Sequence, residues 1–157
     1  MTNRIRFTVG VGTGVALTII VPWLVLASGR MDMSATARPG WVERTLAPWA
    51  VDRSRAHRAP EVRNPSTGSA TAVATGLAHY RENCVMCHGA PGVAGGELAR
   101  GLNPPAPALQ DPNSQDLTDG ELFWTIKHGV RMSGMPAFGP AHSDDEIWAL
   151  VAFVRHG

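Results

Sequence analysis

Two cysteines and a histidine lie together at residues 84–88, which read C-V-M-C-H. This spacing is typical of covalent haem attachment, because two thiols three residues apart can add to the two vinyl groups of one porphyrin and the adjacent imidazole then lies under the iron. A thioredoxin-type redox pair would need a βαβ pattern around it, and a zinc site would need a fourth ligand at suitable spacing. We therefore predict one covalent haem on Cys84 and Cys87, with His88 as an iron ligand.

A second iron ligand is predicted downstream, at Met135. Gly134 allows close approach of the backbone, and Pro136 fixes φ and holds the loop. Met132 is the rival ligand, but it has no proline after it. If neither methionine binds iron, both are packing or surface residues, and the iron is open or bound by a second histidine.

Three helices are expected around this motif, at residues 71–84, 118–128 and from 143 to the C-terminus. The first carries a regularly spaced apolar face, and each of the other two opens with a capping box. The residues that carry these signals are Val73, Leu77, Tyr80 and Cys84 for the first helix, Thr118 and Glu121 for the second, and Ser143 and Glu146 for the third. No segment alternates convincingly between apolar and polar residues, so the fold class is predicted to be all-α.

The N-terminus contains an uncharged stretch from Phe7 to Gly29. As a helix this stretch would run roughly 34 Å, enough to cross a hydrocarbon core of ~30 Å. Residues 1–29 are therefore predicted to be a transmembrane anchor. The alternative is a cleaved signal peptide, because residues 25–27 offer a cleavage site.

Residues 30–70 are interpreted as a connector that contains one possible helix, interrupted by Pro48. Trp41 and Trp49 give this piece an apolar side. We considered two interpretations: the piece lies on the membrane or on the domain's own surface, or it docks onto a neighbouring subunit. Residues 60–69 have the composition of an extended linker.

The charges are divided unevenly along the chain, whose net charge is +1. Residues 1–70 hold nine arginines and four acids, whereas residues 71–157 hold five basic and nine acidic residues. The small net charge argues against nucleic acid as a partner. The acidic second half either favours a redox partner with a basic docking patch or merely solvates a small surface.

Residues 71–157 resemble a class I cytochrome c domain. In that family an N-terminal helix crosses a C-terminal helix through a glycine and aromatic residues. Gly76 and Tyr80 stand at the matching offsets before the cysteine motif, and Leu150 and Phe153 are the expected partners. The resemblance implies a monohaem domain of three or more helices, preceded here by the single transmembrane helix.

The family resemblance also implies a Pro-x-Leu pattern after the haem-binding loop, and Pro107-Ala108-Leu109 matches it. Its proline carbonyl would accept the N–H of the proximal His88, and its leucine would line the haem. Pro104 and Pro105 are the alternatives. Either Trp124 or Trp148 could donate its indole N–H to a haem propionate, although both are expected mainly in the core.

Haem attachment in this family takes place outside the cytoplasmic membrane. The resemblance therefore implies a bacterial inner-membrane protein with its N-terminus inside and its haem domain in the periplasm. The predicted function is electron transfer by a tethered carrier between membrane redox complexes, without enzymatic activity. The alternatives are a fixed cytochrome subunit of a larger respiratory, photosynthetic or dehydrogenase complex, and a haem enzyme or gas sensor with an open iron site.

Overall fold

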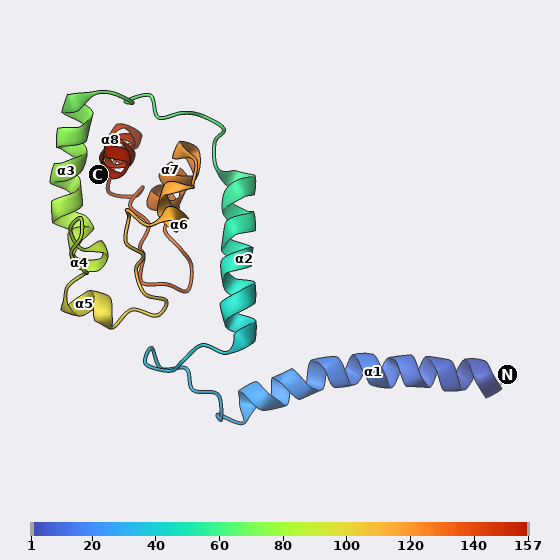
Figure 1. The fold of residues 1–157 in the computed structure, drawn as a ribbon. Helices are drawn as coiled ribbons and strands as arrows, with labels where there is room; N and C mark the ends of the chain where they lie inside the picture. The colour runs from blue at the N-terminus through green and yellow to red at the C-terminus, as the bar shows by residue number, and fades with distance from the viewer. Residues whose placement is uncertain (1, 157) are drawn as a thin grey trace. The chain divides into compact units, whose positions relative to one another are not determined.

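The computed structural model describes residues 2–156, and Figure 1 shows the course of the chain. These residues form helices and loops without a strand, which confirms the all-α prediction. The chain divides into one unit up to Ala37 and a second unit from Arg38 onward. The helices are α1 (Thr2–Ala27), α2 (Trp41–Arg58), α3 (Ala70–Asn83), α4 (Val85–His88), α5 (Glu97–Arg100), α6 (Pro112–Gln115), α7 (Asp119–His128) and α8 (Asp144–His156).

The first unit consists mainly of α1, a 26-residue apolar helix in which no residue is buried. At 1.5 Å per residue it is about 39 Å long, which exceeds a hydrocarbon core of ~30 Å. Pro22 lies inside the helix near its C-terminal end. By length and composition α1 is compatible with a single-pass membrane anchor.

In the second unit α3 lies against α8 (Figure 1). Their closest approach is at Gly76, where an added Cβ would lie 2.0 Å from the carbonyl oxygen of Ala149 and 2.9 Å from Cβ of Phe153. One turn later, the rings of Tyr80 and Phe153 are 4.9 Å apart. The expected crossing through a glycine and aromatic residues is confirmed. Leu150, the other expected partner, is fully buried.

The hydrophobic core lies between α7 and α8. Phe123 and Trp148 stack there with ring centroids 4.2 Å apart. Both helices begin with the predicted capping boxes. At α7 the Thr118 hydroxyl accepts from the N–H of Glu121, and the carboxylate of Glu121 accepts from the N–H of Thr118 at 2.8 Å. At α8 Ser143 and Glu146 make the same pair of contacts. The core residues are Leu122, Phe123, Ile147, Trp148, Val151 and Val154.

The segment before α3 is folded against the domain, which agrees with the interpretation that its helical piece lies on the domain's own surface. Pro48 lies inside the continuous helix α2, which packs against α7. The chain then runs so close to α7 that a Cβ on Gly120 would lie 1.8 Å from the carbonyl oxygen of Pro60. Packing on α7 therefore outweighs the helix-breaking tendency of Pro48, and the compact unit that contains the cysteine motif begins at Arg38.

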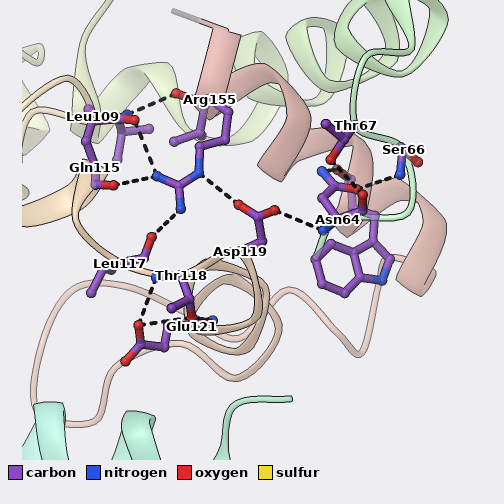
Figure 2. Close-up of polar contacts among 12 residues, drawn as sticks. Asn64, Ser66, Thr67, Leu109, Gln115, Leu117, Thr118, Asp119, Glu121 and Arg155 are labelled. Atoms are coloured by element: carbon purple, nitrogen blue, oxygen red, sulfur yellow. Dashed lines mark hydrogen bonds and ion pairs between the residues drawn. The ribbon is translucent and has the colours of Figure 1, made fainter. Parts of the chain in front are cut away.

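A polar network holds this N-terminal segment to α7 and α8 (Figure 2). The side-chain amide of Asn64 donates to the carbonyl of Trp148 at 2.9 Å, and the backbone N–H of Asn64 donates to Asp119 at 2.9 Å. Arg155 in the last turn of α8 donates to the other carboxylate oxygen of Asp119 at 2.9 Å and to the carbonyl of Gln115 at 2.6 Å. Residues 60–69 are thus anchored at Asn64, which is buried.

The pKa of Asp119 reflects this network. Burial alone would raise the pKa, but the hydrogen bonds from the N–H of Asn64 and from the Arg155 guanidinium outweigh burial and hold the pKa below its usual value. A lowered pKa means that the carboxylate stabilises the folded state above the unfolded pKa of ~3.9, and that this stabilisation is lost as the pH falls through the folded pKa.

Replacing Gly76 with Ala should destabilise the domain by about 1–3 kcal/mol, because the new methyl group must push α3 away from α8. Chemical denaturation of the haem-loaded full chain in detergent measures this change. Gly101→Ala is the matched control, since its Cβ would lie at an ordinary contact distance of 3.6 Å from the nearest atom. Equal stability of the two variants would contradict the tight crossing.

Replacing Asp119 with Asn should cost about 1–3 kcal/mol of unfolding free energy at pH 7, because charge-assisted hydrogen bonds are lost. The difference from wild type should shrink below about pH 4, where the wild-type carboxylate also becomes protonated. Denaturation curves at pH 7 and at pH 3 test this, with the exposed Asp116→Asn as control. A loss of the same size at both pH values would show that the charge of Asp119 is not responsible.

Candidate functional site

The unit that begins at Arg38 encloses a cavity of about 270 Å³. A single water needs only ~10–15 Å³ measured in this way, so the cavity is suited to a large group. Its lining is mostly apolar. All six residues that the sequence assigned to the site line this one cavity: Cys84, Cys87, His88, Pro107, Leu109 and Met135.

His88 is the last residue of α4, and its ring is held by a hydrogen bond. Its Nδ1 lies 2.8 Å from the carbonyl oxygen of Pro107. A carbonyl can only accept, so Nδ1 must carry the proton, which leaves the lone pair on Nε2 free for a metal. Pro104 and Pro105 also line the cavity, but Pro107 is the proline whose carbonyl contacts His88.

The two cysteines are brought to the cavity by a tight helical turn. The N–H groups of Cys87 and His88 both donate to the carbonyl of Cys84, at 3.0 and 2.9 Å. Burial, together with the nearby thiol of Cys87, raises the pKa of Cys84 to about 11, so that Cys84 is a neutral thiol at pH 7. Before any covalent attachment, Cys84 would therefore be a protonated thiol, which is less nucleophilic than a thiolate.

Tyr80 ties α3 to the end of the cysteine motif. Its hydroxyl donates to the carbonyl of Gly89 at 2.5 Å. Burial raises the pKa of Tyr80 to about 12, with a smaller contribution from Cys84, so the phenol keeps its proton. The buried phenol thus fixes the position of residue 89, directly after the candidate iron ligand His88.

Met135 lies in the loop between α7 and α8, and this loop folds back onto the end of α7. Gly129 has φ +66°, and a Cβ there would lie 2.7 Å from the carbonyl oxygen of Met135. The N–H of Val130 donates to the same carbonyl at 3.2 Å, and the N–H of Met135 donates to the Ser133 hydroxyl at 3.1 Å. Met135 lines the cavity, whereas the rival Met132 is 94% exposed and does not.

The residues around the cavity fit a haem. Two thiols, an imidazole with a free Nε2 and a thioether are the donors that covalent attachment and axial ligation require, and the remaining lining is largely apolar. Neither Trp124 nor Trp148 belongs to this lining, so the sequence-based expectation of an indole hydrogen bond to a propionate has no support here.

The charged and amide side chains of the cavity that the sequence reasoning missed are those of Arg55, Asn83 and Asn113. The available signal for Arg55 was its position one helical turn after Val51, on one side of a segment with several apolar residues. That segment had been interpreted as a connector. The two asparagines have no distinguishing sequence context.

Comparison with known proteins gives the family. A search of curated proteins found no match to this chain. A family model described as cytochrome c oxidase, cbb3-type, subunit III, matches residues 71–154. The match includes all but the outermost residues of the helices from α3 to α8 and every cavity residue predicted from the sequence. Since this match extends over more than half of the chain, the protein belongs to that family and carries a class I c-type cytochrome domain, whose role is haem-based electron transfer.

Proposed function

We propose that this protein transfers single electrons through one haem, bound covalently to Cys84 and Cys87 and ligated by His88 and Met135. The observation that supports this most strongly is that these four side chains line one apolar cavity, with the Nδ1 proton of His88 donated to Pro107. Leu109 contributes an apolar wall of the same cavity.

The side chains suit electron transfer better than substrate chemistry. When bound, haem supplies a one-electron couple between ferric and ferrous iron. Nε2 of His88 and the thioether of Met135 would together hold the iron, which would leave no coordination position for a substrate. The thioether and the apolar lining both disfavour the extra ferric charge and raise the reduction potential. A haem enzyme or gas sensor with an open iron site is correspondingly disfavoured.

The cellular setting is also part of the proposal. α1 would anchor the chain in the bacterial inner membrane, with the N-terminus inside and the haem domain in the periplasm. Between the end of α1 and the start of α2 only residues 28–40 remain as a tether. Fully extended, they reach roughly 45 Å. We propose that the domain shuttles within this reach between membrane redox proteins.

The second candidate is a fixed subunit of a larger redox complex. Trp41 and Trp49 are 73% and 59% exposed on α2, and large exposed aromatic residues are typical anchors at interfaces. The name of the matching family also describes an oxidase subunit. The acidic balance of residues 71–157 favours a basic docking patch on the partner in either case.

Met135→Ala should remove the methionine–iron charge-transfer band from the oxidised spectrum. It should also lower the midpoint potential, by on the order of 0.1 V, because axial ligands tune haem potentials over roughly 0.8 V. Absorption spectra and redox titration of the haem-loaded protein measure both effects. Met132→Ala is the matched control and should retain the band. Loss of the band in Met132→Ala instead would transfer the ligand role to Met132.

Extraction of membranes in mild detergent, followed by size-exclusion chromatography, should recover the haem with this polypeptide as a small species if the protein is a tethered carrier. Haem absorbance and the polypeptide are followed together. Co-elution with a large assembly would instead establish a fixed subunit. Recovery of the intact chain in the soluble fraction without detergent would contradict the anchor.

A further inference from the structure

One side of α2 faces the rest of the compact unit. Val51, Ser54 and Arg55 are half-buried at helical spacing, whereas Asp52 and Arg53 between them are exposed. Only 14% of the Arg55 side chain is exposed to solvent. Arginines are rarely buried without a partner, so a buried guanidinium in this helix needs an explanation.

Arg55 also lines the central cavity. Among the described residues 2–156 that line the cavity, Arg55 is the one with a permanent charge. It is also the one that lies outside the segment 71–154 that matches the family. The apolar walls around it give little screening of its charge. A cation in the lining of an apolar cavity is suited to an anionic group of the occupant.

The hydrogen bonds of Arg55 are incomplete. Its Nη2 donates to Asp52 at 2.6 Å. Its Nε lies 3.9 Å from Oε1 of Glu121, which is an ion-pair distance but too long for a hydrogen bond. Nε is buried, and the part of the chain that the structure describes offers it no hydrogen-bond acceptor. The Glu121 carboxylate cannot readily move closer, because its other oxygen accepts from the N–H of Thr118 in the capping box.

We propose that Arg55 binds a propionate carboxylate of the haem, so that α2 completes the haem site from outside the cytochrome domain. A guanidinium offers donors in a planar fork that matches the two oxygens of a carboxylate, and the partnerless Nε–H is one arm of that fork. The inference rests on the proposed function, since it requires a haem in this cavity. It adds a residue and a helix that the family match does not include.

A redox consequence follows from this contact. The ferric haem carries one more positive charge than the ferrous haem, so a guanidinium beside it disfavours the ferric state. Arg55 therefore raises the midpoint potential. The charged groups that act against it are the carboxylates of Asp52 on α2 and of Glu121 on α7. Through Arg55, the helix that follows the membrane anchor tunes the electron-transfer centre.

The test compares three variants of the haem-loaded full chain in detergent. Arg55→Gln should lower the midpoint potential measured by redox titration, and Arg55→Lys should restore most of the wild-type value. Arg53→Gln removes the same charge from an exposed position two residues away and should leave the potential close to wild type. Potentials of Arg55→Gln and Arg53→Gln that match each other would overturn the proposal.

A second measurement uses the unmodified sequence and does not depend on the folding of a variant. In ¹⁵N-labelled wild-type protein, the Nε–H of Arg55 should exchange slowly with solvent and change its chemical shift when the iron is oxidised to its paramagnetic ferric state. The signal is assigned to Arg55 because it should be missing from the spectrum of the Arg55→Lys variant. Rapid exchange without an oxidation-dependent shift would refute the contact.

These outcomes separate the proposal from the function on which it rests. The methionine–iron charge-transfer band reports the ligation by Met135, and Arg55 has no part in that bond. A wild-type protein that lacks the band but shows the shift of the Arg55 signal would refute the Met135 ligand and support Arg55. A protein that shows the band, but in which neither the potential nor the NMR signal responds to Arg55 as described, would support the Met135 ligand and refute the role of Arg55.

Discussion

The close approach of α3 and α8 at Gly76 determines where the other parts of the site can lie. α3 leads directly into the cysteine motif, and α8 contributes Leu150 and Val154 to the cavity wall. With any side chain at position 76, the backbone of Ala149 would have to move, and the thiols at the end of α3 would move relative to that wall. The absence of a side chain at Gly76 thus sets the dimensions of the cavity, although Gly76 itself does not line it.

Hydrogen bonds then fix the loops that the helices leave free. His88 is oriented by the carbonyl of Pro107, and the phenol of Tyr80 holds residue 89. The loop that carries Met135 is held at Val130 and Ser133. These contacts hold parts of the cavity that are far apart in the sequence, so that His88 and Met135 line the same space. The apolar side chains of the cavity offer few directional contacts, so hydrogen bonds to backbone groups and to the Ser133 hydroxyl position the candidate ligands.

Local signals explain how much could be predicted from the sequence. The C-x-x-C-H spacing and the two capping boxes are decided within five residues, and a family resemblance supplied the proline partner of His88. The choice between Met135 and Met132 also had a local basis, because Pro136 follows only one of them. The structure places Met135 at the cavity and leaves Met132 in solvent.

The role of α2 could not be predicted in this way, because the reason for it is tertiary. Pro48 and the polar residues around it indicate a broken connector, and only the packing on α7 keeps the helix continuous. The close fit of Pro60 against Gly120 and the anchoring of Asn64 likewise depend on residues more than 50 positions away. Composition alone therefore left the position of this segment on the domain open.

The folded position of α2 changes what a tethered cytochrome can do. If residues 30–70 were a flexible linker, the haem domain would range widely and its partners could lie far apart. If α1 anchors the chain in a membrane as proposed, the packing of α2 on α7 shortens the tether to residues 28–40. A shorter tether raises the effective concentration of the domain near partners beside the anchor and excludes distant ones. The exposed tryptophans of α2 then move as part of the domain surface, so any partner that binds them also holds the haem site at a fixed distance.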